Sequence, residues 1–377
     1  MASSHVLVLP FPAQGHVNPL MLFSRKLVKH GFKITFVNTD IVHKRVVGAL
    51  DSLMDSKINM VSIPDGLGPE DDRNEIGKLL ADAGMGWALE AANKMGIKGV
   101  IYWSPSTASL ALQLSIPRLI DDGIINCEGL PTQRQMIQLF PGMPAMDTAY
   151  IPWNCIGDPT CQKIFFQYTL RYMQAFKFAD WWLCNTVHEL DNHPAQSCML
   201  PLVALQFLIP TQFQELAIGL ELTNRPFLWV VRPDILNGSK TAYTKEFQGT
   251  RGKIVGWAPQ TKVLNHPAIA CFISHCGWNS TVEGLSNGVP FLCWPYFADQ
   301  FLDRSYICDV WKVGLGFEQD ENGIILREEI KRQVDQLLGD ANIRARSLEL
   351  KKMLMNNVAE NGQSSKNFNN FIQWLKE

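Results

Sequence analysis

The chain has 377 residues, of which 46% are hydrophobic and 19% charged, and its formal net charge at pH 7 is -2. This length favours two domains, and the composition excludes wholesale disorder. The near-neutral charge excludes a dominant electrostatic attraction to nucleic acid or to an anionic membrane, so we expect neither as a partner. The nine cysteines are scattered without a Cys-x-x-Cys pair, which argues against a disulfide framework or a structural zinc site and favours a reducing compartment.

The N-terminal segment is interpreted as a first buried strand and not as a signal peptide. Its apolar run at 5–10 has no basic region before it, and Pro10 and Pro12 break it early. No uninterrupted apolar stretch of the chain approaches the ~20 residues that are needed to span a bilayer. We therefore expect a cytoplasmic protein with no membrane span.

The first hundred residues alternate strand and helix. Apolar runs predict strands at 5–10, 32–38 and 58–64. A helix that stops at Gly31 and a weaker helix at about 41–54 separate them. Buried apolar strands joined by helices predict a parallel sheet that is covered on both faces.

The second half repeats this theme. Strands are predicted at 226–231, 253–257, 270–274 and 289–294, and a helix-like, aromatic-rich region at about 106–180 lies between the halves. Two doubly wound units in one chain predict a cleft between the carboxyl ends of two sheets. Ligands bind such folds there.

The stretch SHCGWNSTVEG at 274–284 joins a predicted strand to a predicted helix. Ser280 and Glu283 fit the Ser-x-x-Glu capping box, a purely structural feature in which Gly277 permits a tight turn. The same helix start would also present free amides and a positive dipole end to a phosphate, with His275 as a further donor. The two interpretations share residues, and the pattern alone leaves both open.

A longer block, from Trp257 to Gln300, places this stretch in context: WAPQTKVLNHPAIACFISHCGWNSTVEGLSNGVPFLCWPYFADQ. It closely resembles the signature block of plant UDP-dependent glycosyltransferases (family 1, GT-B fold), with its internal spacing preserved. Weaker resemblance includes LPFPAQGHVNP near the start and the NFNNFIQWL tail. The resemblance implies an α/β protein with two doubly wound, Rossmann-like domains that face each other across a cleft. The expected parts are an N-terminal acceptor-binding domain over 1–195, a C-terminal UDP-sugar-binding domain over 196–360, and a C-terminal helix over 361–377 that packs back on the N-terminal domain.

The resemblance also implies a donor site. Trp257 would stack on the uracil ring, for which its flat face is suited, and a core tryptophan is the alternative. Glu283 would hold the ribose, because a carboxylate can accept from two adjacent hydroxyls. Gln300 at the end of the block is similar to glucose-using members. The other implied UDP-binding residues are Ala258, Gln260, His275, Asn279 and Ser280, and the implied sugar-facing residues are Trp278, Asp299, Gln300 and Ser104.

His16 is the candidate catalytic base. It is expected in the loop after the first strand, at the carboxyl end of the sheet, although a lone histidine is more often structural. The resemblance makes it the general base that takes the acceptor's hydroxyl proton, an effect of ~10²–10⁴-fold. Asp82 would orient the imidazole. The implied reaction is transfer of glucose from UDP-glucose, with inversion, to a small hydrophobic acceptor such as a flavonoid or terpenoid. No metal or other cofactor is implied, and we expect a monomer.

Two segments of the family pattern look deleted. The expected helix and apolar strand before Asp82 are replaced by NEIGKLLAD, which follows almost directly on an acidic loop at 64–75. Around 196–213 a single apolar run replaces a strand and a Gly-Ser loop. Each sheet is then expected to lose a central strand, so the alternative function is an impaired or non-catalytic nucleotide-sugar-binding variant. A nucleotide-dependent oxidoreductase is set aside, because FPAQGHVNP lacks the Gly-x-Gly-x-x-Gly pattern.

Overall fold

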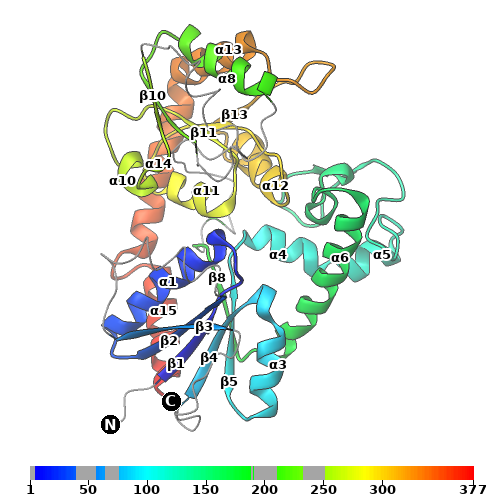
Figure 1. Ribbon diagram of the computed structural model, residues 1–377, viewed down its shortest axis with the longest axis vertical. Coiled ribbons are helices and arrows are strands. Elements are labelled where there is room, and N and C mark those ends of the chain that lie inside the picture. The colour runs from blue at the N-terminus through cyan, green and yellow to red at the C-terminus, as the bar shows by residue number, and fades with distance from the viewer. Residues whose placement is uncertain (1–4, 40–56, 64–75, 188–189, 191–209, 232–250) are drawn as a thin grey trace. The chain divides into compact units, whose positions relative to one another are not determined.

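The computed structural model describes residues 5–39, 57–63, 76–187, 190, 210–231 and 251–377 (Figure 1). The chain divides into two compact units. The first contains 1–133, 156–186 and 360–377, and the second contains 134–155 and 187–359. The predicted domain boundary at 195, the helix at 41–54 and the acidic loop at 64–75 lie outside the described residues.

The first unit is built on a six-stranded parallel sheet with the strand order β3-β2-β1-β4-β5-β8. The chain winds outward from β1 in one direction and then in the other, so the carboxyl ends of β1 and β4 meet at the switch point, where doubly wound folds bind ligands. The strands are β1 (His5–Leu9), β2 (Lys33–Thr39), β3 (Ile58–Ile63), β4 (Ile76–Asp82), β5 (Lys98–Trp103) and β8 (Trp181–Cys184).

Helices cover both faces of this sheet, as the apolar strands predict. On one face, α1 (Gln14–Lys29) and the C-terminal α15 (Gln363–Lys376) share a core with Phe36 and Val8. On the other face, Leu79 and Ile101 pack with the helices that follow β4 and precede β8. The further elements of this unit are η2 (Ala83–Met85), α3 (Trp87–Lys94), α4 (Thr107–Leu114), α5 (Ile116–Asp121), α6 (Pro159–Met173) and η5 (Gln174–Phe178) (Figure 1).

The prediction that this sheet loses a central strand is wrong. The segment IGKLLAD forms β4 and pairs in parallel with β1 on one side and β5 on the other. Leu79 and Ala81 are buried on one face and Leu80 on the other, the alternation of a strand that is covered on both sides. The family segment that is missing before Asp82 is therefore not this strand. Only residues 64–75 connect β3 to β4.

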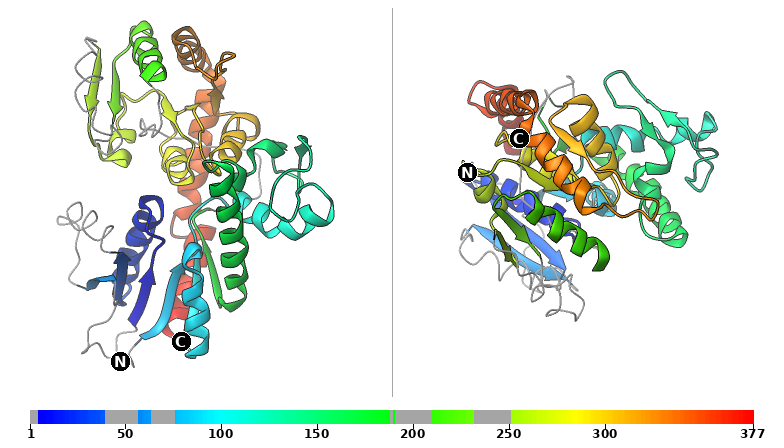
Figure 2. Two further views of the ribbon diagram at one scale, coloured as in Figure 1. Left: turned by 45° about the vertical axis from the view of Figure 1, so that its right-hand side comes forward. Right: turned by 90° about the horizontal axis from the view of Figure 1, so that it is seen from above.

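In the second unit, five of the described strands form two separate parallel sheets, and two form an antiparallel hairpin. β9 (Phe227–Val230) pairs with β10 (Gly252–Val255), and β11 (Phe272–Ser274) pairs with β12 (Phe291–Cys293), which pairs with β13 (Gly314–Gly316). Within the described part of the chain, β9 and β11 are not paired, and Figure 2 shows β9 and β10 as a separate yellow-green pair beside α8. Most of the stretch 196–213, in which a strand is predicted to be missing, lies outside the described residues.

Helices join these two sheets through a shared core. The ring of Phe213 in α8 (Pro210–Leu222) stacks on Trp229 of β9 at a centroid distance of 4.5 Å, and both belong to one cluster with Ile273 and Leu292 of the other sheet. The other elements are a small hairpin, β6 (Met136–Ile137) with β7 (Met146–Asp147), the short helices η3 (Thr148–Tyr150) and η4 (Pro152–Asn154), and α10 (Gln260–Leu264), α11 (Trp278–Leu285), α12 (Gln300–Ser305), η7 (Tyr306–Val310), α13 (Arg327–Gly339) and α14 (Ala341–Val358). In the described ranges, no helix combines the length and apolarity that a membrane crossing needs.

Candidate functional site

His16 lies in the first turn of α1 and not in the predicted loop, because the helix already begins at Gln14. The loop was predicted from the Gly and Pro residues of FPAQGHVNP. Pro19 lies inside the helix and has no N–H for the carbonyl of Gly15, four residues earlier. That carbonyl accepts instead from Ser104 Oγ at 2.9 Å. A tertiary contact therefore allows helix where the local sequence predicts a loop.

His16 is paired with Asp82. Its Nδ1 lies 2.8 Å from Asp82 Oδ2, and the aspartate is only 1% exposed at the end of β4. The other carboxylate oxygen, Oδ1, accepts from the backbone N–H of Gly84 at 2.9 Å. An aspartate held in this way fixes the tautomer of the imidazole, and the base would then be Nε2.

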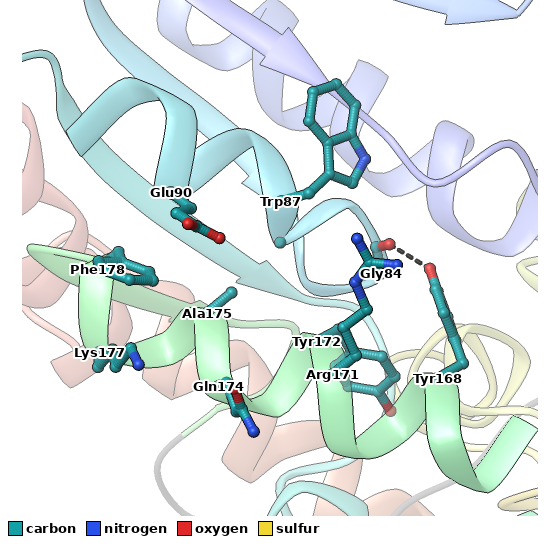
Figure 3. Close-up of a pocket in the computed structure, with 11 residues that line it drawn as sticks. Gly84, Trp87, Glu90, Tyr168, Arg171, Tyr172, Gln174, Ala175, Lys177 and Phe178 are labelled. Atoms are coloured by element: carbon teal, nitrogen blue, oxygen red, sulfur yellow. Dashed lines mark hydrogen bonds between the residues drawn. The ribbon is translucent and has the colours of Figure 1, made fainter. Parts of the chain in front are cut away.

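Aromatic residues that the sequence did not single out surround this pair. Phe11 meets the His16 ring edge-on, with the ring centroids 5.2 Å apart. The Tyr168 hydroxyl donates to the carbonyl of Gly84, the residue whose N–H holds Asp82 (Figure 3). A Cβ on Gly84 would lie 2.8 Å from Phe11 Cδ2, so this close packing requires glycine. Tyr168 lies 84 residues after Gly84, and no spacing in the sequence signals the contact.

A pocket of about 390 Å³ opens beside Gly84, between the start of α3 and the end of α6. Trp87, Glu90 and Arg171 are among the side chains that line it (Figure 3). Gly84 belongs both to this pocket and to the turn that holds Asp82. None of the site residues predicted from the sequence lines the pocket.

In the second unit, the start of α11 corrects the capping-box interpretation. The helix begins at Trp278 with Gly277 as its N-cap, and no side chain caps it. The chain turns early because Cys276 adopts the left-handed region, with a φ of 67°. Ser280 is therefore the third helical residue, and its Oγ accepts from Gln260 Nε2 at 2.9 Å. The helix start keeps its positive dipole end.

His275 lies directly before this turn as a neutral imidazole. Burial lowers its pKa to about 4, and among the described residues its buried Nδ1 has no hydrogen-bond partner. A Cβ at Gly277 would lie 2.4 Å from His275 Nε2, so only glycine accommodates this ring position. An imidazole with an unused buried nitrogen at a helix start is suited to donate to an anion.

Glu283 supplies a second unsatisfied group, within α11 itself. Its Oε2 is buried and has no hydrogen-bond partner within the described part of the chain. Burial raises the pKa of this carboxyl group, and hydrogen bonds with Gln260 and Thr261 oppose the increase. Because buried polar atoms are rarely left unpaired, one such atom just before α11 and another on α11 indicate a polar ligand.

Trp257 follows β10 and is 71% exposed, which excludes the alternative of a core tryptophan. Such an exposed indole offers its face for stacking. Ala258 is half-buried next to it, Gln260 begins α10, and Asn279 is the half-buried second residue of α11.

The residues expected to face the sugar differ in their availability. Trp278 is 5% exposed, and its indole packs in the core with its ring centroid 6.4 Å from that of Trp311. Asp299 is half-buried at the start of α12, after Ala298, which has a φ of 52°. Gln300 is buried, and its Oε1 accepts the backbone N–H groups of residues 296 and 297 at 3.0 and 3.1 Å. Ser104 belongs to the first unit.

Comparison with known proteins identifies the fold. UGT2 of Phytolacca americana, complexed with UDP-2fluoro-glucose and pterostilbene, superposes with a TM-score of 0.81 at 22% identity, covering 100% of both chains. Os79 of O. sativa in complex with UDP gives a TM-score of 0.75 at 24% identity, covering 98% of this chain and 100% of that one. The chain is therefore an α/β protein of the GT-B fold.

The sequence comparisons then show the family. The model for UDP-glucoronosyl and UDP-glucosyl transferase matches residues 206–342, and the model for the glycosyltransferase N-terminal domain matches 2–65. UDP-glycosyltransferase 83A1 of Arabidopsis thaliana is 38% identical over 463 aligned residues, covering 100% of this chain and 97% of that protein. Linamarin synthase 1 of Manihot esculenta is 30% identical and covers 98% of this chain and 96% of its own length. The chain belongs to the plant family 1 UDP-glycosyltransferases and is a glycosyltransferase.

The alignment with UDP-glycosyltransferase 83A1 also shows that this chain is shorter than that relative. The alignment with UDP-glycosyltransferase 83A1 has 463 positions and this chain has 377 residues, so at least 463 − 377 = 86 positions have no residue of this chain. The relative thus contains positions that this chain lacks.

Proposed function

We propose that this chain transfers glucose from UDP-glucose to a hydroxyl group of a small hydrophobic acceptor, with inversion at the anomeric carbon. The observation that carries the proposal is the contact of 2.8 Å between His16 Nδ1 and the buried Asp82. We place the protein in the cytoplasm as a monomer that needs no metal.

In the proposed reaction, His16 Nε2 accepts the proton of the acceptor hydroxyl. The acceptor oxygen forms a bond to the anomeric carbon as the bond from that carbon to the UDP oxygen breaks on the opposite face. UDP-α-glucose then yields a β-glucoside and UDP. Asp82 stabilises the imidazolium that forms, and such a general base contributes ~10²–10⁴-fold.

The second unit supplies the donor side of the proposal. The exposed face of Trp257 suits the uracil ring. The Glu283 carboxylate oxygen, which has no hydrogen-bond partner among the described residues, suits the ribose hydroxyls. His275 and the uncapped start of α11 suit the diphosphate. The helix dipole contributes roughly 0.3–1 kcal/mol, and up to ~2 kcal/mol when partly buried, so positive potential is available without a metal. We expect turnover to be unchanged by EDTA.

The acceptor class is supported by relatives. Pterostilbene is bound in a structure of Phytolacca americana UGT2, and 7-deoxyloganetin glucosyltransferase of Catharanthus roseus is 26% identical to this chain. These names point to a stilbene and to a terpenoid, which are small and largely apolar. We propose that the acceptor is a flavonoid, terpenoid or similar metabolite with a free hydroxyl group.

The test is an acceptor screen with UDP-glucose. Release of UDP should require the acceptor, and the product should show the large anomeric proton coupling of a β-glucoside by NMR. An α-glucoside would refute inversion, and release that is independent of any acceptor would refute transfer to a hydroxyl group.

One observation favours a second candidate, a chain that binds UDP-sugars but has impaired turnover. In the described part of the second unit, β9 and β11 do not pair, so the sheet that carries the donor residues is divided. Buried parallel strands without a neighbour lose ladder hydrogen bonds and packing. Calorimetric measurement of UDP affinity beside turnover separates the two candidates, because tight binding with no glucoside formed favours the second.

A further inference from the structure

The second turn of α1 contains a proline where the helix needs a donor. Pro19 is the sixth residue of α1 and has no backbone N–H, so it cannot donate to the carbonyl of Gly15. In the structure this carbonyl accepts from Ser104 Oγ at 2.9 Å. The serine hydroxyl therefore takes the place of the N–H that Pro19 lacks.

Ser104 is held firmly enough to fix the helix. It is 4% exposed and directly follows β5. Asn185 makes two hydrogen bonds to this backbone. Its side-chain Nδ2 donates to the Ser104 carbonyl at 3.3 Å, and its backbone N–H donates to the carbonyl of the preceding Trp103 at 3.0 Å. The Trp103 indole N–H also donates to the Ser106 carbonyl at 2.8 Å. The backbone around the hydroxyl is thus anchored to β8 and to the start of α4.

The contact acts on the residue next to the proposed base. Gly15 immediately precedes His16, and the strands β1, β4 and β5 are neighbours in the sheet. Asp82 at the end of β4 holds the His16 ring, and Ser104 at the end of β5 holds the backbone that carries it. The base is therefore held through its side chain and through its main chain from two adjacent strand ends.

We propose that Ser104 is a positioning residue for His16, which acts by replacing the missing N–H of Pro19 at the Gly15 carbonyl. This role differs from the sugar contact that the family resemblance implies for Ser104. It rests on the proposed function of His16 as the base, and it predicts an effect on the chemical step and not on binding of the donor.

The first test is Ser104→Ala, assayed with UDP-glucose and a phenolic acceptor that the wild type uses. We expect kcat to fall about tenfold, the size of one lost hydrogen bond of about 1.4 kcal/mol, with the KM for UDP-glucose unchanged. Ser106→Ala is the matched control. Ser106 is 2% exposed and caps α4 by accepting from the Ser109 N–H at 3.3 Å, so its loss affects the same loop without touching Gly15. Its kcat should stay near the wild-type value.

The decisive test adds Pro19→Ala to Ser104→Ala. Alanine at position 19 restores a backbone N–H that can donate to the Gly15 carbonyl within the helix. The double variant should therefore recover most of the lost kcat, while Pro19→Ala alone should change kcat little. The same cycle measured by urea unfolding should show that the stability lost in Ser104→Ala is also recovered.

The outcomes separate this inference from the proposed function. If the double variant shows the product of the two single-variant losses in kcat, Ser104 does not replace the missing N–H of Pro19, and the inference is overturned. A raised KM for UDP-glucose that Pro19→Ala does not rescue supports a sugar contact of Ser104 in its place. A wild-type chain without any turnover refutes both the proposed function and the positioning role. The unfolding cycle still decides whether Ser104 replaces the N–H of Pro19.

Discussion

Asp82→Asn removes the charge beside His16 while preserving the shape of the side chain. The carboxamide oxygen can keep the hydrogen bond from the Gly84 N–H, which is 2.9 Å long in the structure. Its NH2 group then faces His16 Nδ1 at the position of the oxygen that now lies 2.8 Å away. Two donors cannot face each other, so Nδ1 must accept and the ring proton moves to Nε2. The base is lost although the geometry remains.

We expect kcat to fall by ~10²–10⁴-fold, which is about 3–5 kcal/mol of transition-state stabilisation. The assay combines the initial rate of UDP release with the UDP affinity measured by calorimetry. The affinity should not change, because Asp82 belongs to the first unit and the donor residues belong to the second. Asp180→Asn is the matched control, since Asp180 also accepts a backbone N–H, from Gly99 at 2.8 Å, in the same unit. A kcat within about threefold of wild type in Asp82→Asn would refute the role of the pair.

Three further predictions concern the donor side. Trp257→Ala should weaken UDP binding by roughly 1–3 kcal/mol. The free energy of unfolding should not change, since the ring is 71% exposed. A calorimetric UDP affinity equal to that of the wild type would contradict stacking. Glu283→Gln should weaken UDP binding at least about tenfold, and an unchanged affinity argues against the ribose contact. The variant should not lower the free energy of unfolding at pH 7, because burial raises the pKa of this carboxyl group and so disfavours its ionised form in the folded state. Burial lowers the pKa of His275 from 6.5 to about 4, so its contribution to stability is present above pH 6.5 and is lost as the pH falls toward 4. His275→Gln should therefore flatten the dependence of the unfolding free energy on pH between these values, measured by urea unfolding. An unaltered dependence contradicts a neutral, buried imidazole.

The sequence predicted the strands well because their apolar runs report burial on both faces. The runs at 5–10, 32–38 and 58–64 are β1, β2 and β3, and those at 270–274 and 289–294 contain β11 and β12. β5, β8 and β13 are not among the predicted strands, and the Gly-Leu-Gly of β13 carries no apolar run. The segment before Asp82 suggests a deletion because it follows almost directly on the acidic loop, but the ladder with β1 and β5 makes it a strand.

Helix starts were harder to predict because distant contacts decide them. At His16, the Gly and Pro residues predict a loop, and the helix found there has a contact from Ser104, 89 residues after Gly15. At Ser280, the left-handed turn at Cys276 starts α11 earlier than the Ser-x-x-Glu pattern predicts. The contact of Tyr168 with Gly84 is likewise formed between segments that no local pattern relates.

Replacement of His16 by alanine tests the central claim most directly. The variant and the wild type are compared for glucoside formation from UDP-glucose, with UDP affinity measured on the same preparations by calorimetry. We expect His16→Ala to lose at least about a hundredfold in kcat while binding UDP as tightly as the wild type. Glucoside formation at a rate near that of the wild type would contradict the assignment of His16 as the base.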